Sequence, residues 1–334
     1  MVRVCTVGAG WVVDSFLEGM KQAAPDMVHS AVYSFSEAEA KMFSEKHGVK
    51  TIFTDLEKLA KSDEVDAVYI ANPNAFHYAT AKILLENGKH VLCEKTCVVT
   101  SEQLRILYEI ADKNGVIFME AMKGIYMPEI RVITEAMKKL GDIHMVKLDF
   151  CRYSSKYPEY REGGTPNIFN PKMAAGGLMD MGIYLVYPAI YWFGVPSKIA
   201  ADASILRTGA DACGTVLFHS AGNVHITMSY GKASTSHHEN LIMGDIGVIH
   251  MDSVERFDNC YIEYFDGKKE NLITRDLSVN PWGPETKQFY DFITDPGTKE
   301  RYEQSKVLTT QVIAAMEEIR DLADIKFPEE CYQA

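Results

Sequence analysis

A lysine follows a predicted strand at a place where it could act on a ligand. The apolar run HVLCEK, residues 90–95, predicts a buried strand that ends in Glu94 and Lys95. A lysine at the carboxyl end of a parallel strand can polarise a carbonyl group or hold a hydroxyl group by a hydrogen bond. The alternative is a solvated lysine on a loop, which the position directly after a buried strand disfavours.

A second pair of candidates lies in the segment GGLMDMGIYLVYPAIYWFG, residues 176–194. This segment predicts a helix, and Asp180 and Tyr184 are four residues apart, so both side chains share one helix face. A carboxylate and a phenol on one face can orient a ligand and exchange a proton with it. The alternative for Tyr184 is a core tyrosine, which is our interpretation of Tyr187 and Tyr191 in the same aromatic run.

A glycine-rich turn opens the chain's first helix. The predicted strand VRVCTVG leads into Gly8, Gly10, Trp11 and Val12, where the helix begins. Backbone N–H groups and the helix dipole at such a turn can bind a pyrophosphate, so the pattern predicts a dinucleotide site. Val13 stands where the dinucleotide fingerprint has its third glycine. The alternative is a tight strand-to-helix turn without a ligand.

Residues at the end of the second predicted strand are expected to bind the adenosine ribose of the cofactor. An acidic residue there favours NAD, and an arginine favours NADP. This chain has Ser34 and Phe35, followed by Ser36 as the N-cap of the next helix and Glu39 as its capping-box partner. Ser34 could bind a ribose hydroxyl or phosphate, and Phe35 could flank the adenine. The choice between NAD and NADP therefore stays open.

Polar side chains also follow the predicted strand VDAVYIAN, residues 65–72. Asn72, Asn74 and His77 come directly after it, at the sheet edge where open α/β sheets bind ligands. We predict that they contact the cofactor together with Glu94 and Lys95. For His77, a purely structural role at the start of a helix is equally compatible with the sequence.

The elements that must position these residues form two regions. Over residues 1–122, apolar strands alternate with amphipathic helices, which predicts a parallel sheet covered on both faces and hence a dinucleotide-binding Rossmann domain. Over residues 123–334, strands follow one another with few helices, which predicts an α/β domain with an open, mainly antiparallel sheet. We assign substrate binding and oligomerisation to this second domain, and we expect its terminal helix at about residues 307–324.

Several motifs occur in one order along nearly the whole chain: G-x-G after the first strand, N-P-N-x-x-H at 72–77, L-x-x-G-K-H-V-L-x-E-K at 85–95, and G-G-L-M-D-M-G-I-Y at 176–184. Together they resemble the Gfo/Idh/MocA family. The resemblance implies the two-domain fold predicted above, NAD(P) as cofactor, and hydride transfer to or from a sugar, cyclitol or dihydrodiol-like substrate.

The resemblance also implies roles for particular residues. The family's E-K-P motif falls on Glu94, Lys95 and Thr96, with threonine in place of proline. Its D-x-G-x-H/Y motif falls on Asp180, Gly182 and Tyr184, with tyrosine as in the glucose–fructose oxidoreductase and dihydrodiol dehydrogenase branches. Hydride transfer creates an alkoxide that needs a proton. Tyr184 is therefore the expected proton donor, Lys95 supplies positive charge, and Asp180 orients Lys95 or a substrate hydroxyl.

Several further residues are weaker candidates, among them a polar stretch before the G-G motif with Tyr153, Ser154, Ser155, Lys156 and Asn167, where substrate contacts are plausible. Glu120 and Lys123 lie at the end of the last strand of the first domain and could face the ligand. Trp282, in the segment NPWGPE, could cover the edge of the nicotinamide, and packing in a surface loop is an equal alternative.

Charge and composition exclude several classes of protein. The 334-residue chain has 34 Lys and Arg against 46 Asp and Glu, a net charge of −12, which disfavours nucleic-acid and acidic-membrane partners. No apolar run approaches the roughly 20 residues that a membrane span requires. The seven scattered cysteines fit reduced thiols and a cytoplasmic location. The adjacent His237 and His238 lack a third ligand at useful spacing, so we predict no metal site.

Two other functions use the same cofactor domain. One is a non-enzymatic regulator that senses NAD(P), which would not need a proton donor such as Tyr184. The other is an NAD-dependent glycosidase or lyase, in which the hydride leaves and returns without net redox change. The alternating apolar residues of VHITMSY and CYIEYF further predict a homodimer or higher homo-oligomer through the C-terminal sheet.

Overall fold

The computed structural model describes residues 1–274, 276 and 278–333. The chain forms two compact units. The first comprises Met1–Lys123, Ser278–Val307 and Gln333, and the second comprises the described residues of 124–277 and 308–332. The first unit thus includes a segment that the sequence analysis assigns to the second domain. The predicted roles of the two domains stay predictions.

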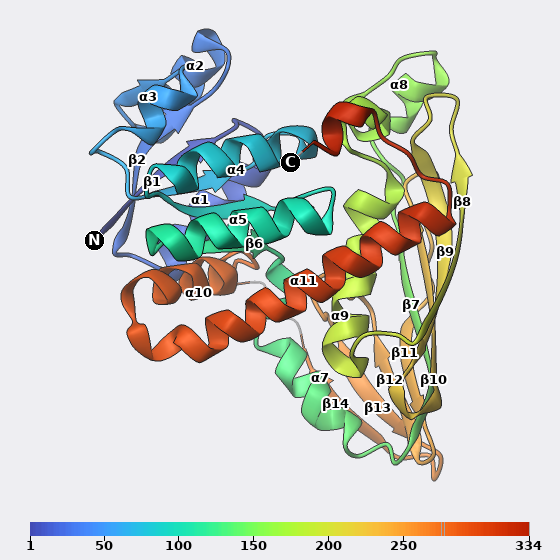
Figure 1. Cartoon of the computed structure of the whole chain (residues 1–334). Helices are drawn as coiled ribbons and strands as arrows, with labels where there is room; N and C mark the ends of the chain where they lie inside the picture. Colours follow the sequence, from blue (N-terminus) through green and yellow to red (C-terminus); the bar gives the residue numbers. More distant parts are fainter. Residues whose placement is uncertain (275, 277, 334) are drawn as a thin grey trace. The chain divides into compact units, whose positions relative to one another are not determined.

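The first unit contains the predicted parallel sheet. Within the described residues its strand order is β3-β2-β1-β4-β5-β6, and every neighbouring pair is parallel (Figure 1). Because all of these strands are parallel, their carboxyl ends lie at one sheet edge. The strands are β1 (Val2–Val7), β2 (Met27–Tyr33), β3 (Thr51–Phe53), β4 (Ala67–Ile70), β5 (His90–Glu94) and β6 (Phe118–Ala121).

Helices follow these strands as the alternating pattern predicts. In the first helix the buried positions include Val13, Phe16, Leu17 and Met20, spaced so that one apolar stripe faces the sheet. Gly48 and Gly115 have left-handed backbone angles where two of the helices end. The helices are α1 (Trp11–Ala23), α2 (Glu37–His47), α3 (Leu56–Ala60), η1 (Asn74–Phe76), α4 (His77–Glu86), α5 (Ser101–Asn114) and α6 (Lys123–Tyr126).

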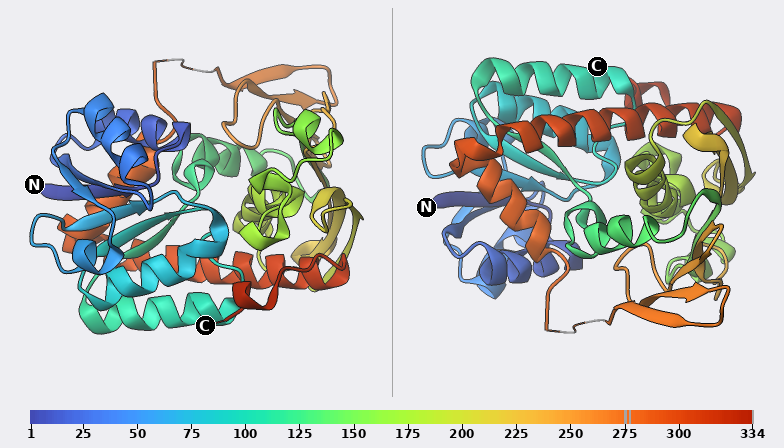
Figure 2. Two further views of the ribbon diagram at one scale, coloured as in Figure 1. Left: turned by 90° about the horizontal axis from the view of Figure 1, so that it is seen from above. Right: turned by 90° about the horizontal axis from the view of Figure 1, so that it is seen from below.

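A later helix pair packs onto the first unit. Helix α10 (Gly283–Thr294) contacts α1, and Gly19 allows this contact because a Cβ there would lie 2.8 Å from the backbone nitrogen of Gly283. Helix α11 (Lys299–Leu322) begins beside α5 (Figure 2). Lys306 of α11 pairs there with Asp112 of α5 at 2.9 Å. It starts earlier than the predicted residue 307, directly after the turn that contains Pro296 and Gly297.

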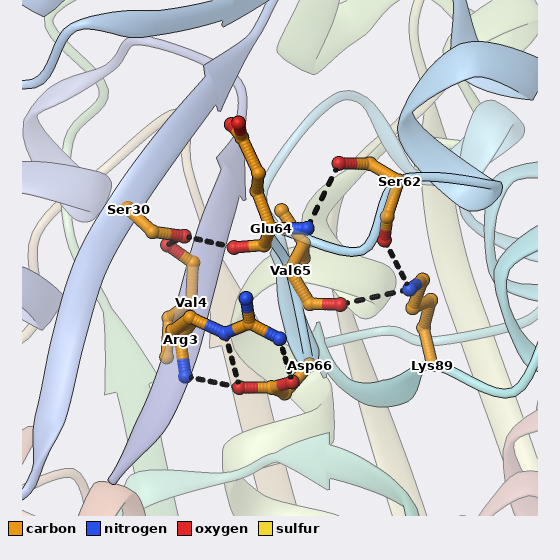
Figure 3. Close-up of polar contacts among 8 residues, drawn as sticks. All are labelled: Arg3, Val4, Ser30, Ser62, Glu64, Val65, Asp66 and Lys89. Carbon is orange, nitrogen blue, oxygen red and sulfur yellow. Dashed lines mark hydrogen bonds and ion pairs between the residues drawn. The ribbon is translucent and has the colours of Figure 1, made fainter.

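A separate polar cluster connects the amino ends of β1, β4 and β5 (Figure 3). The Arg3 guanidinium binds the Asp66 carboxylate at 2.6 and 2.9 Å, which joins β1 to the residue before β4. The Lys89 ammonium donates to the carbonyl oxygens of Ser62 and Val65 at 2.6 and 2.8 Å. These contacts hold the sheet at the edge opposite to the candidate ligand-binding residues.

The second unit contains a mixed sheet in the order β14-β13-β12-β11-β7-β10-β9-β8. Only the β7–β10 pair is parallel within the described residues, so the predicted mainly antiparallel sheet is confirmed. The strands are β7 (Ile143–Cys151), β8 (Lys198–Ile205), β9 (Asp211–Ser220), β10 (Val224–Gly231), β11 (Asn240–Gly244), β12 (Gly247–Met251), β13 (Cys260–Tyr264) and β14 (Lys269–Ile273).

Side chains alternate across this sheet. Helix α9 (Ile183–Phe193) covers one face of the sheet at β7 and β10 (Figure 1). Val146, Ile226 and Ile242 are buried on one face of the sheet. Met145 and Leu217 on the other face are exposed. The other helical elements of this unit are α7 (Glu129–Met137), α8 (Tyr157–Arg161), η2 (Asn167–Phe169), η3 (Pro171–Met173), the π-helical turn η4 (Leu178–Gly182) and η5 (Ala221–Asn223).

One apolar stretch, Pro171–Phe193, is long and apolar enough to cross a membrane by length and composition. The sequence analysis expects no run of this length. However, 83% of its apolar window is buried inside the protein, as in the core helix of a globular protein.

Candidate active site

The turn after β1 depends on two glycines. Gly8 has a φ of +105°, and a Cβ there would lie 2.8 Å from the carbonyl oxygen of Ala71, so the turn packs directly against the end of β4. A Cβ on Gly10 would meet nothing within 4 Å. The first glycine is therefore needed for close backbone packing, and the second leaves open space before the helix.

The amino end of α1 fits a dinucleotide pyrophosphate. Gly10 is the N-cap and provides no side-chain hydrogen bond to the backbone N–H groups of the first turn, where Trp11 and Val12 lie. Uncapped N–H groups and the helix dipole favour an anion at this position. The Trp11 side chain is 69% exposed and contacts the Trp282 ring edge-on, with centroids 6.0 Å apart. Trp282 itself is buried rather than on the surface, and whether it covers the nicotinamide or only packs stays open.

At the end of β2 the predicted capping box is only half formed. The Ser36 hydroxyl accepts a hydrogen bond from the Glu39 N–H at 3.4 Å, as predicted. The Glu39 carboxylate instead accepts a hydrogen bond from the Ser34 hydroxyl, whose oxygen in turn accepts from the Ser36 N–H at 3.2 Å. Ser34 is buried, whereas the neighbouring Phe35 is 68% exposed.

His77 has a structural position at the start of α4. The ring is fully buried, with Nδ1 3.0 Å from the Thr96 carbonyl oxygen and Nε2 2.8 Å from the Asn72 carbonyl oxygen. Burial lowers the pKa of His77 to about 4, and the two carbonyl contacts oppose this shift. The neutral ring carries one N–H, so it donates to only one of the two carbonyl oxygens at a time. The contacts join the loop after β4 to the loop that carries Lys95. They favour the structural alternative that the sequence leaves open.

The other predicted cofactor contacts after β4 lie close by. Asn72 donates a hydrogen bond to the Thr80 hydroxyl at 3.4 Å, and Asn74 begins the short helix η1. The side-chain oxygen of Asn72 is buried and accepts no hydrogen bond within the described part of the chain. An unsatisfied buried amide oxygen is a suitable acceptor for a ligand donor group.

Glu94 ends β5 and Lys95 follows it, in a polar cluster. The Tyr69 hydroxyl of β4 donates a hydrogen bond to the Glu94 carboxylate. Burial raises the pKa of Glu94, and the Tyr69 hydrogen bond and the ammonium groups of Lys95 and Lys123 oppose that rise. The Lys95–Thr96 peptide bond is cis. Lys95 therefore leaves the sheet beside a carboxylate and a second lysine.

Two further residues complete this cluster. The Glu120 carboxylate accepts a hydrogen bond from the Cys97 N–H at 2.8 Å, and the Lys123 ammonium lies 4.3 Å from the centre of the Trp282 ring. The sequence analysis treats Glu120, Lys123 and Trp282 as weak candidates only.

Glu285 on α10 is a site residue that sequence reasoning missed. Its side chain is fully buried, and neither carboxyl oxygen has a hydrogen-bond partner among the described residues. Burial raises the pKa of Glu285 well above its usual range, the charge of Glu94 raises it further, and Lys123 opposes both. The signal in the sequence was a glutamate in the first turn after Trp282, Gly283 and Pro284.

In the second unit, glycines fix the helix that carries Asp180 and Tyr184. Gly176 has a φ of +156°, and a Cβ there would lie 1.9 Å from an oxygen of the buried Asp211 carboxylate. The other Asp211 oxygen accepts a hydrogen bond from the Leu178 N–H at 2.7 Å. A Cβ on Gly182 would lie 2.7 Å from the Leu178 side chain. The G-G-x-x-D-x-G spacing thus fits the helix against β9 and β10.

Asp180 and Tyr184 lie in consecutive turns, in η4 and α9. The Asp180 carboxylate forms an ion pair with Lys232, a buried lysine directly after β10. The Tyr184 ring packs edge-on against Phe150 of β7, with centroids 5.4 Å apart. Single π-helical turns within helices are frequent at functional sites. Sequence reasoning expected Asp180 to orient Lys95 or a substrate hydroxyl and did not include Lys232.

The structure therefore groups the predicted residues by unit. Gly8, Gly10, Trp11, Val12, Ser34, Phe35, Asn72, Asn74, His77, Glu94 and Lys95 belong to the first unit, at the carboxyl ends of its strands or in the turns that follow them. Asp180 and Tyr184 belong to the second unit. Within the described ranges, no group of three or more His, Cys, Asp or Glu side chains is arranged to hold a metal ion.

Comparison with protein-family models identifies both parts of the chain. Residues 2–122 match the oxidoreductase family with an NAD-binding Rossmann fold, and residues 135–250 match the Gfo/Idh/MocA C-terminal domain. The chain belongs to the Gfo/Idh/MocA family. It is accordingly an oxidoreductase that uses NAD(P), and the resemblance seen in the sequence motifs is confirmed.

Curated relatives of this family include dehydrogenases. The chain is 36% identical to scyllo-inositol 2-dehydrogenase (NADP(+)) IolU of Bacillus subtilis, over 98% of this chain and 99% of the relative. It is 28% identical to trans-1,2-dihydrobenzene-1,2-diol dehydrogenase of Mus musculus, over 72% of each chain.

A solved structure agrees with the fold. The 3-ketoreductase KijD10 from Actinomadura kijaniata matches with a TM-score of 0.81 and 20% identity, over 96% of this chain and 98% of that chain. At this identity the comparison establishes the two-part fold, and the predicted fold class is confirmed.

Proposed function

We propose that this enzyme transfers a hydride reversibly between NAD(P) and a hydroxyl- or carbonyl-bearing carbon of a cyclitol or related polyol. One observation carries this proposal: Asp180, held by an ion pair with Lys232, lies one helical turn before Tyr184. A carboxylate and a phenol are thus presented on one short segment. The relative named for scyllo-inositol, similar over nearly the full chain, supports a cyclitol as the substrate class. Sugars and dihydrodiols are the next classes to test.

Tyr184 and Lys95 are the proposed catalytic residues. The Tyr184 phenol donates a proton to the substrate oxygen during reduction and receives it back during oxidation. Lys95 places positive charge at that oxygen and stabilises the developing alkoxide. Asp180, oriented by Lys232, accepts a hydrogen bond from a neighbouring substrate hydroxyl. The vicinal hydroxyl groups of a cyclitol suit such an acceptor.

The first unit holds the cofactor in this proposal. Bound NAD(P) supplies or accepts the hydride. The backbone at Gly8, Gly10, Trp11 and Val12 binds its pyrophosphate, as the uncapped helix end and the open space at Gly10 allow. Ser34 and Phe35 face the adenosine, and Asn72, Asn74, Glu94 and Lys95 extend the site along the sheet edge.

The test is an activity screen with purified protein. Scyllo-inositol, myo-inositol, sugars and dihydrodiols are offered with NAD or NADP, and reduced cofactor is followed by absorbance. Turnover of a cyclitol is expected, and Tyr184→Phe and Lys95→Ala should lower kcat by about 10²- to 10⁴-fold. Tyr191→Phe is the matched control because Tyr191 lies on the same helix and its side chain is exposed, so the interpretation of Tyr191 as a core residue is wrong.

Other outcomes of the screen identify the alternatives. Tight cofactor binding without turnover of any substrate would favour an NAD(P)-sensing regulator. Substrate conversion without net change in cofactor would favour a glycosidase or lyase. Equal activity of wild-type enzyme and Tyr184→Phe would remove Tyr184 from the proposed chemistry.

We further propose a cytoplasmic homodimer or higher homo-oligomer formed through the open face of the C-terminal sheet. Met145 and Leu217 are exposed on that face, and Leu241, Met243 and Tyr261 are half-buried there. Burying such apolar side chains against a second copy is favourable. Within the described residues no cysteine forms a disulfide, which fits a reducing compartment. Light scattering that gives a monomer mass would contradict the assembly.

A further inference from the structure

The Glu39 carboxylate lies near the end of β2, where the first unit is expected to bind the adenosine ribose. β2 lies directly beside β1, and the Gly8 N–H donates a hydrogen bond to the Tyr33 carbonyl oxygen at 3.2 Å. The glycine-rich turn and the residues after β2 are therefore joined. In this fold the residues after the second strand meet the ribose of a dinucleotide.

The Glu39 carboxylate is held in this position by hydrogen bonds. The Ser34 hydroxyl donates to Glu39, and the Ser36 N–H donates to the Ser34 oxygen at 3.2 Å. Glu39 lies in the first turn of α2 and is exposed. Ser34 is buried, so it anchors one carboxylate oxygen from the protein side. The carboxylate therefore has remaining acceptor capacity for a ligand.

The same turn contains no positive charge. Residues 34–40 read SFSEAEA, with two glutamates and no lysine or arginine. The cations that follow are engaged by acidic side chains: Lys41 with Glu37 at 2.8 Å, and Lys46 with Asp14 at 2.7 Å. A ribose 2′-hydroxyl can donate a hydrogen bond to a carboxylate. A 2′-phosphate has only negatively charged oxygens to offer and is repelled.

Exposed aromatic rings flank this turn. Phe35 contacts Tyr33 of β2 edge-on, with centroids 5.5 Å apart, and Phe76 of η1 at 6.0 Å. Phe35 and Phe76 are both exposed, one after β2 and one after β4. Exposed ring faces at this point suit stacking with an adenine, which is common to NAD and NADP. Discrimination between the two cofactors therefore rests on the ribose.

We propose that Glu39, positioned by Ser34, is the residue that makes this enzyme select NAD over NADP. This inference rests on the proposed function, in which the first unit binds a nicotinamide dinucleotide. It assigns to a helix residue the task that an acidic residue at the strand end performs in many Rossmann domains. The relative named for NADP(+) thus differs from this chain in its cofactor.

The experiment measures the binding of NADH and NADPH to the full-length protein by calorimetry or nicotinamide fluorescence. Wild-type protein should bind NADH at least about tenfold more tightly than NADPH, and the ratio should fall as salt is added. Glu39→Gln should reduce the ratio several-fold, and Glu39→Arg should reverse it. Ser34→Ala should reduce it less, because the carboxylate stays but loses its anchor.

Glu37→Gln is the matched control. Glu37 lies in the same helical turn, is exposed, and pairs with Lys41, so its removal should leave the ratio within about twofold of the wild-type value. Equal or tighter binding of NADPH by wild-type protein, or an unchanged ratio in Glu39→Gln, would overturn the proposal. Binding of neither cofactor by folded protein would overturn the proposed function and this inference with it.

Discussion

The ammonium of Lys232 and the carboxylate of Asp180 form an ion pair one helical turn before Tyr184. Lys232 is only 7% exposed. Its N–H donates to the Ala212 carbonyl oxygen at 2.8 Å, and its carbonyl oxygen accepts from the Ser154 N–H at 2.9 Å. The lysine is thus fixed on both sides by backbone contacts, and it determines which way the Asp180 carboxylate points.

Replacing Lys232 by methionine should damage both stability and catalysis. The change leaves the Asp180 carboxylate without its ammonium partner, which should cost about 1–3 kcal/mol of unfolding free energy. Loss of carboxylate orientation should lower kcat by about 10²-fold. Urea unfolding and steady-state kinetics with the substrate found by the screen measure the two effects.

A double-mutant cycle separates the ion pair from packing. Combining Lys232→Met with Asp180→Asn should recover most of the lost stability, because no unpaired carboxylate charge remains. It should not recover the activity, because the Asp180 carboxylate is missing. Lys232→Arg should retain more activity than Lys232→Met. Additive losses of stability in the double variant would show that the two side chains do not act as a pair.

The sequence could predict Asp180 and Tyr184 together but not Lys232. Two residues four apart on a predicted helix share a face whatever the rest of the chain does. Lys232 reaches Asp180 only because β10 pairs with β9 and β7 in a particular register. That pairing is non-local, and nothing near Lys232 in the sequence GKASTS indicates its partner.

Gly176→Ala should destabilise the helical segment that carries Asp180 and Tyr184. A Cβ at Gly176 would lie 1.9 Å from an oxygen of Asp211, a fully buried carboxylate that caps the Leu178 N–H. Either the carboxylate or the helix must move, and we expect a loss of about 3 kcal/mol or more in a urea melt.

Gly267→Ala is the control for backbone strain alone. Gly267 also has a positive φ, +89°, but a Cβ there would meet no atom within 4 Å. Its substitution should cost about 1–2 kcal/mol, the cost of the left-handed conformation. Similar losses at the two positions would argue that the contact with Asp211 has no special importance.

His77 should make the first unit sensitive to acid. Burial lowers its pKa in the folded state to about 4, below the usual value near 6.5. The unfolded chain therefore binds a proton first, and the stability from neutral His77 is present above about pH 6.5 and lost as the pH falls towards 4. His77→Gln should lower the unfolding free energy at pH 7 and have a smaller effect at pH 4.5.

Chemical unfolding at several pH values checks this prediction. Burial also lowers the pKa values of His29 and His90 to about 4, so the wild-type slope includes three histidines. The informative quantity is the difference between wild type and His77→Gln at each pH. A difference that stays constant from pH 7 to pH 4.5 would contradict a neutral, buried His77.

The sequence also predicts the first sheet well and its covering helices less completely. The alternation of strands and helices over residues 1–122 is local, and each strand is a continuous apolar run. Helix α10 returns to the first unit from residue 283, where Gly19 and Gly283 allow close packing. No local pattern shows which unit a late helix will join, so Trp282 and Glu285 could not be placed from the sequence.

Glu285→Gln should remove a decline in the free energy of unfolding that occurs as the pH rises. The Glu285 side chain is fully buried, and burial followed by the charge of Glu94 raises its pKa well above the usual range. The unfolded chain loses this proton above about pH 4.3, whereas the folded protein keeps it. Stability from Glu285 is therefore greatest at low pH and declines as the pH rises towards its folded-state pKa.

Glutamine copies the shape of the neutral acid and cannot ionise, so the variant lacks this decline. At pH 4, wild type and Glu285→Gln should have similar unfolding free energies, and the variant should become progressively more stable than wild type towards pH 8. Glu300→Gln, at an exposed position in the first turn of α11, should track wild type at every pH. If the free energies of wild type and Glu285→Gln run parallel from pH 4 to pH 8, Glu285 ionises in the folded protein as it does in the unfolded chain, which would contradict a raised pKa.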